Sequence, residues 1–160
     1  MKHKARDGYC IKHHPLFVPS RKQSSKISCE IIDKLALELD TPFQHVHYEE
    51  GLDNPIGVEY CHPNYPKKGI DGAFEYEDEL VLFEFHGDYW HGHPSQHNKG
   101  TTERETTLKE SFIETQRIMR KVVECTKMRL FYVWEFDYDR LEEDAPIWSI
   151  VREFNGILEW

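Results

Sequence analysis

Two strand-like segments joined by a short acidic turn constrain the fold of this chain more than any other feature of its sequence. The segments are residues 69–76 (GIDGAFEY) and 80–87 (LVLFEFHG), and an acidic stretch around Glu77–Asp78 separates them. If the turn is centred on Glu77–Asp78, antiparallel pairing places Asp71 directly across from Glu84. The sequence therefore predicts a β-hairpin that carries one carboxylate on each strand.

Amphipathic and apolar segments around the hairpin predict the remaining elements. Helices are expected over residues 24–39, 107–128 and 146–160, strands over residues 43–50 and 129–139, and a polar loop over residues 93–106. Ser25 or Ser28 is the expected N-cap of the first helix. Residues 80–83 are apolar without interruption, which is typical of a strand buried on both faces. This order predicts an α/β fold in which helices flank a mixed central β-sheet.

Length and charge indicate how the chain is organised. Its 160 residues suit a single domain over residues 25–160 that follows an N-terminal arm of residues 1–24. The formal net charge is −9, but the first 26 residues carry seven lysines and arginines against one acid. We expect this basic arm to bind phosphate locally while the acidic remainder attracts divalent cations. A solvated, disordered tail is the alternative interpretation of the same charges.

The sequence predicts an intracellular protein that does not enter a membrane. No apolar run approaches the ~18 residues that span a bilayer. A secretory signal requires an apolar stretch after its basic residues, and no such stretch follows the basic residues at the N-terminus. The four widely spaced cysteines are therefore expected to be reduced thiols; they are Cys10, Cys29, Cys61 and Cys125.

The hairpin carboxylates and a nearby histidine have the chemistry of a divalent-metal site. Magnesium binds one or two carboxylates and keeps several waters, and Asp71 with Glu84 would supply that pair. Glu84 and His86 share a face of their strand because they are two residues apart, and His86 could accept a proton from the attacking water. Asp71 could otherwise be a strand-start residue, His86 a core histidine, and Asp88 a turn residue or a further ligand. The set suits metal-assisted hydrolysis of a phosphodiester.

The block EFHGDYWHGHP at residues 84–94, with Asp71 before it and RLFYVWEFD after it, resembles the restriction-endonuclease-like (PD-(D/E)xK) superfamily. Within that superfamily it is similar to the very-short-patch-repair-like branch and to the related EDxHD nucleases of phages and large DNA viruses. The resemblance covers roughly residues 25–140. It implies a restriction-endonuclease-like core and a Mg²⁺- or Mn²⁺-dependent DNA endonuclease of a phage or virus.

The resemblance also implies roles for individual residues. The implied catalytic residues are Asp71, Glu84, His86, Glu30 and His91, and the first two would hold the metal. The implied DNA-binding residues are Tyr89, Trp90, Arg117, Arg120, Arg21, Lys22 and Lys26. Of these, Tyr89 and Trp90 would wedge into the duplex beside the cut. From the residues alone, packing in the hydrophobic core is the expected role of these two aromatics. Gln116 stands near the place where relatives carry an acid, so the long helix is expected to contact phosphate through its arginines.

Other functions fit the same residues. A catalytically silent DNA-binding or recombination accessory module on the same fold fits the histidine at the family's lysine position and the glutamine at Gln116. A zinc-stabilised interaction module would draw on cysteines and histidines elsewhere; the candidates are Cys10, His13, His14, Cys61, His62, His93 and His97. Their spacing lacks the tight ligand pairs that are typical of zinc sites. An isologous homodimer would suit double-strand cleavage.

Overall fold

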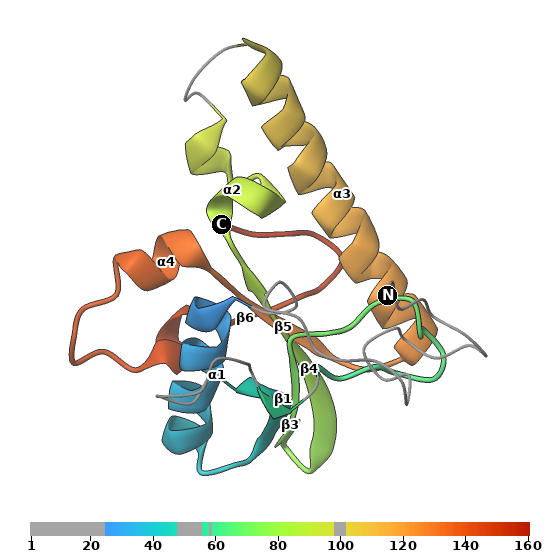
Figure 1. Ribbon diagram of the computed structural model, residues 1–160, viewed down its shortest axis with the longest axis vertical. Helices are drawn as coiled ribbons and strands as arrows, with labels where there is room; N and C mark the ends of the chain where they lie inside the picture. The colour runs from blue at the N-terminus through green and yellow to red at the C-terminus, as the bar shows by residue number, and fades with distance from the viewer. Residues whose placement is uncertain (1–24, 48–55, 58, 98–101) are drawn as a thin grey trace. The chain divides into compact units, whose positions relative to one another are not determined.

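The computed structural model describes residues 25–47, 56–57, 59–97 and 102–160 (Figure 1). The chain divides into two compact units, residues 1–83 and 84–160, and β4 (Glu79–His86) crosses from the first to the second. The predicted basic arm lies outside the described residues, and Arg21 and Lys22 lie there with it. Helices and a mixed β-sheet together confirm the predicted α/β class.

Among the described residues of the first unit, the helix α1 (Lys26–Leu39) comes first. Ser25 is its N-cap, and the Ser25 hydroxyl oxygen accepts a hydrogen bond from the Ser28 amide at 3.1 Å. Asp40 ends the helix in the left-handed conformation, with φ of 48°. The apolar face of α1, which includes Ile31, Ile32 and Leu35, is buried. The predicted helix and its N-cap are confirmed.

Within the described ranges, four strands follow α1 in the order β2-β1-β3-β4, and their pairings are antiparallel. They are β1 (Phe43–His47), β2 (Ile56–Gly57), β3 (Gly72–Tyr76) and β4. Phe43 and Phe74 stack at 4.2 Å between ring centroids on the face that packs against α1. A Cβ atom at Gly72 would lie 3.4 Å from Ile32 on the same face, so this glycine allows the helix to approach the sheet closely.

The β3–β4 hairpin has the predicted register. Its pairs run from Gly72 with Phe83 to Tyr76 with Glu79. Glu77 and Asp78 form the two-residue loop, with φ of 51° and 63°, as in a type I′ turn. The prediction that the apolar run is buried throughout was wrong at Leu80. This residue is 47% exposed because it pairs with Glu75 at the open end of the hairpin.

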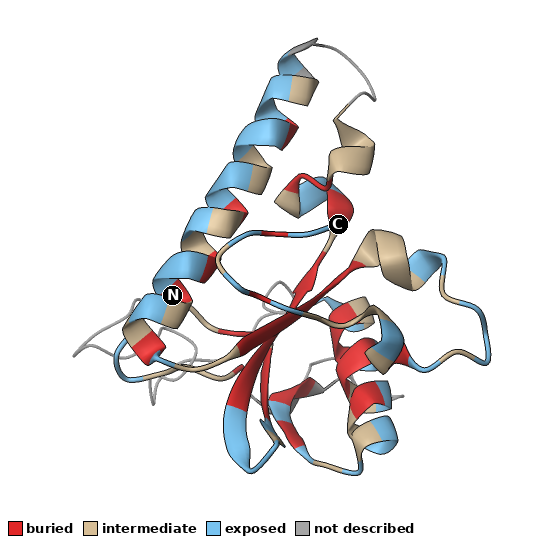
Figure 2. Cartoon of the chain, turned by 180° about the vertical axis from the view of Figure 1, so that it is seen from behind, coloured by how far each residue is buried: buried red, intermediate tan, exposed pale blue. Residues whose placement is uncertain are grey.

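The described part of the second unit contains the end of β4 and seven further elements. They are α2 (Asp88–His91), η2 (Pro94–Gln96), α3 (Thr102–Thr126), β5 (Leu130–Trp134), α4 (Glu135–Asp139), η3 (Ile147–Ile150) and β6 (Arg152–Glu153). The strand order in this unit is β4-β5-β6, and β5 is buried along its whole length (Figure 2). Long α3 is buried along one side only, as an amphipathic surface helix is.

Three sequence predictions in this unit were wrong. The predicted polar loop contains η2 and the start of α3, because the acids Glu103 and Glu105 suit the positive end of a helix dipole. The predicted strand over residues 129–139 ends at Trp134, and its polar second half forms α4. The predicted last helix is instead η3 followed by β6, because residues 152–153 pair with β5 and Gly156 adopts φ of 104°.

Two further predictions concern membranes and thiols. None of the helices within the described residues combines the length and the apolar character that a membrane crossing requires. The three cysteines that the structure describes, Cys29, Cys61 and Cys125, carry free thiols.

Candidate active site

The end of β4 carries a carboxylate and an imidazole on one face of the strand. Glu84 is 5% exposed and His86 is 2% exposed. Because side chains alternate along a strand, Glu84 and His86 lie on the same side, as the sequence predicted. Two ionisable groups buried in an otherwise apolar strand are costly unless other groups compensate for the lost hydration.

His86 lies among residues of α3, α2 and β5. Its Nε2 atom is 3.0 Å from the Met119 sulfur of α3. Its ring centroid is 5.2 Å from that of Trp134 and 5.6 Å from that of Tyr132, both on β5. The His91 ring lies 4.6 Å away. The structure therefore brings together the two histidines that the sequence had selected as catalytic.

The short helix α2 packs against α3 (Figure 1). Gly92 ends α2 with φ of 68°, and a Cβ atom there would lie 1.9 Å from the Leu108 carbonyl oxygen of α3. Only glycine permits this contact. His91 Nδ1 is 3.1 Å from the Thr115 hydroxyl oxygen of α3.

Asp88 and His93 face α4 instead. The Asp88 carboxylate accepts a hydrogen bond from the Phe136 amide at 3.0 Å, and the Asp88 amide donates to the Glu135 carboxylate at 3.3 Å. Burial raises the pKa of Asp88 from 3.8 to about 6, and the neighbouring Glu135 and Asp139 carboxylates add to the rise. Through its hydrogen bond from the Phe136 amide, the Asp88 carboxylate links α2 to α4.

The His93 ring stacks on Phe136 at 4.5 Å and packs edge-on against Trp134 at 4.8 Å. His93 Nδ1 accepts a hydrogen bond from the Ser95 amide, which caps η2. The Nε2 atom is buried and has no hydrogen-bond partner in the part of the chain that the structure describes. Burial lowers the pKa of His93 from 6.5 to about 4, so the imidazole is neutral at physiological pH.

The two aromatic residues selected as a DNA wedge lie on the surface. Trp90 is 78% exposed, and Tyr89 is about half exposed, so the expectation that both pack in the core was wrong. Their rings meet edge to face at 5.2 Å between centroids. Adjacent exposed aromatic rings are candidates for a binding surface.

In the first unit, Asp71 lies among other acidic residues. Burial raises the pKa of the Cys29 thiol to about 12, and the negative charges of Asp71, Asp33 and Glu59 add smaller contributions. Glu59 is buried, and Asp33 Oδ1 lies 3.0 Å from Nε2 of the buried His45. Sequence reasoning missed Asp33 and Glu59. The signal for Asp33 was its position four residues after Cys29, on the same face of α1.

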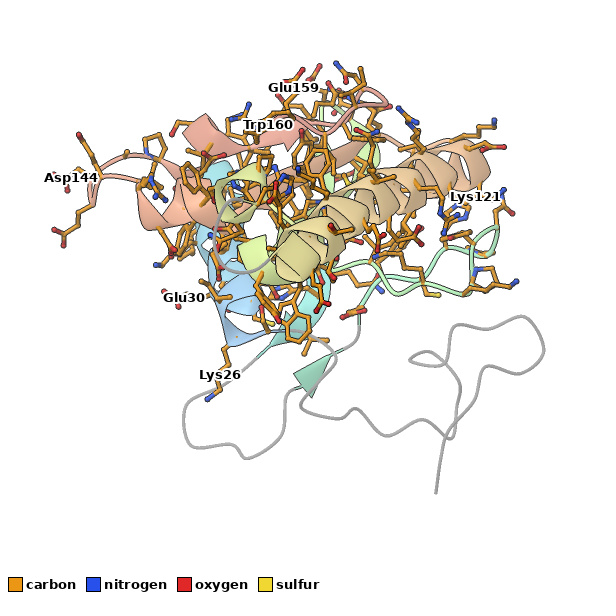
Figure 3. All side chains as sticks on the ribbon, turned by 90° about the horizontal axis from the view of Figure 1, so that it is seen from above. Lys26, Glu30, Lys121, Asp144, Glu159 and Trp160 are labelled. Carbon is orange, nitrogen blue, oxygen red and sulfur yellow. The ribbon has the colours of Figure 1, made fainter. Side chains whose placement is uncertain are left out.

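The remaining selected residues take part in surface interactions. Glu30 projects from α1 (Figure 3) and forms an exposed ion pair with Lys34 at 2.8 Å. The Arg117 guanidinium donates two hydrogen bonds to the Glu114 carboxylate, and Arg120 Nε donates to the Gly156 carbonyl oxygen. Lys26 is the first residue of α1.

The zinc candidates are dispersed. Cys10, His13 and His14 lie outside the described residues. The Cys61 thiol donates to backbone carbonyl oxygens, and His62 Nδ1 accepts from the Asn64 amide. Across the described ranges, no three or more histidine, cysteine, aspartate or glutamate side chains form a group that could hold a metal ion by themselves.

Comparison with known protein families, with curated proteins and with solved structures finds no match to this chain. The likeness to the PD-(D/E)xK superfamily therefore rests on the residues of the sequence.

Proposed function

We propose that the protein is a metal-dependent DNA endonuclease with a restriction-endonuclease-like core. The observation that carries the proposal is the end of β4, where Glu84 and His86 are almost fully buried on one face and the His91 ring lies against His86. A carboxylate beside two imidazoles offers a metal ligand and a proton acceptor within one short segment.

The proposed metal ligands are Asp71 and Glu84. The hairpin register pairs Gly72 with Phe83, and Asp71 and Glu84 are the next residues on the two strands. Two carboxylates suit Mg²⁺ or Mn²⁺ because these ions take few protein ligands and keep bound waters for the substrate to displace. That the two carboxylates face each other remains a prediction. In the proposal Glu30 assists from α1.

The metal ion and the two histidines would have separate roles in the hydrolysis of the phosphodiester. A bound divalent ion would polarise the phosphate and lower the pKa of the attacking water. One histidine of this pair would accept the water proton and the other would contact the phosphate or the leaving oxygen; the sequence alone assigns the first role to His86 and the second to His91. Both imidazoles are held by packing and hydrogen bonds from α3, which limits the reorganisation that catalysis requires.

Contacts with DNA would come from the exposed surface. Tyr89 and Trp90 are exposed and could stack on or between bases. Arg117 and Arg120 lie exposed on α3 and would contact the phosphate backbone after exchanging their present partners. The basic arm would add affinity that weakens with salt, because phosphate contacts release counterions.

Nicking of supercoiled plasmid tests the proposal. The wild-type protein should nick with Mg²⁺ or Mn²⁺ and not with EDTA, and Asp71→Ala should abolish nicking while circular dichroism shows an intact fold. Asp78→Ala, in the hairpin loop, is the matched control and should nick normally. Nicking by Asp71→Ala at the wild-type rate would refute the assignment.

A catalytically silent DNA-binding module on the same fold is the second candidate. The near-complete burial of His86 favours it, because a catalytic base must meet its substrate. The same assay separates the two functions. Duplex binding without cleavage in either metal would support the silent module.

A further inference from the structure

We propose that Thr115 on α3 is a positioning residue that fixes the tautomer and orientation of His91, and that His91 accepts the proton of the attacking water. The catalytic part of this inference rests on the proposed nuclease function. The orientation of the imidazole does not, and it can be measured separately.

The hydrogen bonds of Thr115 determine which nitrogen of His91 carries the proton. The Thr115 hydroxyl donates its single hydrogen to the Ser111 carbonyl oxygen, one turn earlier in α3, at 2.8 Å. Toward His91 Nδ1, 3.1 Å away, the same oxygen can therefore only accept. Nδ1 carries the hydrogen, so in the neutral imidazole Nε2 carries the lone pair.

The amphipathic pattern of α3 explains why Thr115 reaches this histidine. The inward side of the helix is formed by residues at helical spacing; its buried members are Leu108, Thr115, Met119, Val122 and Thr126. Thr115 and Met119 are one turn apart, and they meet His91 and His86 respectively. A hydroxyl in this apolar row is buried with both of its hydrogen bonds made.

Burial separates the roles of the two histidines. The Met119 sulfur can only accept, so His86 Nε2 donates its hydrogen to it. His86 is 2% exposed, whereas His91 is only partly buried and lies on α2 beside the exposed Trp90. His91 is therefore the histidine that a substrate can reach, and the role of proton acceptor moves from His86 to His91.

In the proposed step the water oxygen forms a bond to phosphorus, and the bond from phosphorus to the leaving sugar oxygen breaks. One water proton passes to His91 Nε2, and the leaving oxygen, on the opposite side of the phosphorus, takes a proton from solvent water; the imidazolium then releases its proton to solvent. Throughout the step, Nδ1–H continues to donate to Thr115, whose hydroxyl keeps the ring from rotating.

The test combines nitrogen NMR of His91 with single-turnover nicking. His91 should show a protonated Nδ1 and an unprotonated Nε2 in the wild-type protein. Thr115→Val, which removes the hydroxyl without changing the shape, should shift the tautomer equilibrium and slow nicking about 10- to 100-fold. Thr115→Ser should restore both. Thr107→Val removes an exposed hydroxyl with the same backbone hydrogen bond and should change neither.

The outcomes separate the two proposals. A protonated Nε2 in the wild-type protein, or a tautomer that Thr115→Val leaves unchanged, would overturn the role of Thr115. Wild-type protein that nicks no DNA, but in which Thr115 controls the tautomer, would overturn the nuclease and keep the positioning role. Nicking that depends on His86 and not on His91 would overturn the assignment of the proton acceptor.

Discussion

Residues 84–93 face two different surroundings, and the contrast between them separates candidate catalytic groups from structural ones. On the α3 side, His86 and His91 each face a side-chain acceptor on the helix. On the α4 side, Asp88 and His93 are buried against Phe136. Burial raises the pKa of Asp88 and lowers the pKa of His93, so it favours the neutral form of each side chain. Histidines two residues apart in the sequence thus have different roles, because one lies in α2 and the other caps the following turn.

The largest expected difference between the α3 side and the α4 side is in the rate of nicking. His91→Ala should lower the nicking rate about 10²- to 10⁴-fold, the usual contribution of a general base. His93→Phe keeps the aromatic stack on Phe136 and should change the rate less than about threefold, since we expect His93 to have no catalytic role. Single-turnover nicking measures both. Equal losses in the two variants would show that the two sides do not differ.

The next effect concerns the contact between α2 and α3. Gly92→Ala should destabilise the protein by more than about 3 kcal/mol, because a left-handed φ is combined with a clash against a backbone carbonyl. Gly156→Ala is the matched control. Its φ is also positive but no atom lies near its Cβ position, so it should cost about 1 to 2 kcal/mol. Urea denaturation at 25 °C measures both values, and equal costs would contradict the close contact.

A smaller effect should appear in the pH dependence of stability. The folded pKa of Asp88 is raised to about 6, so its stabilising contribution is fully present below pH 3.8 and is lost as pH rises through about 6. His93 acts in the opposite sense, because its lowered pKa makes its contribution fall as pH drops from 6.5 toward 4.

Asp88→Asn separates these two terms, since the amide oxygen can still accept from the Phe136 amide. Between pH 4 and pH 7, the wild-type protein should lose about 2 kcal/mol relative to this variant. Denaturation curves at several pH values measure the difference. A difference that stays constant with pH would contradict the raised pKa.

The smallest stability effect is expected at the surface of α1. Glu30→Gln should change the free energy of unfolding by less than about 0.5 kcal/mol, because the pair with Lys34 is exposed. If Glu30 assists metal binding as proposed, the same variant should lower the nicking rate at low Mg²⁺. Glu38→Gln, on the same helix, is the control and should nick normally. Equal nicking by both variants would remove Glu30 from the site.

Local patterns predicted the part of the fold that local interactions determine. The hairpin register followed from two apolar segments and a two-residue acidic loop, and the start of α1 followed from a serine cap. The last segment was missed because non-local bonds hold it. The Tyr132 hydroxyl and the Trp134 indole both hydrogen-bond to the backbone of Glu159. Gln116 likewise accepts from the Leu158 amide, so its role is structural.

The candidate site was predictable to a similar extent. The shared face of Glu84 and His86 follows from their two-residue spacing in a strand. Thr115 and Met119 were not predicted, because the residues that an α-helix turns toward a particular histidine depend on tertiary packing. The available signal was a threonine in the apolar row of α3, a position where a polar residue needs a hydrogen-bond partner.

Titration calorimetry with Mn²⁺ tests the central claim most directly, because it reports the metal site without requiring cleavage. The wild-type protein should bind Mn²⁺, and Asp88→Asn on the α4 side should bind it equally well. Glu84→Gln on the α3 side should bind at least about tenfold more weakly, since it loses a charged ligand. Unchanged Mn²⁺ affinity in Glu84→Gln would contradict the account.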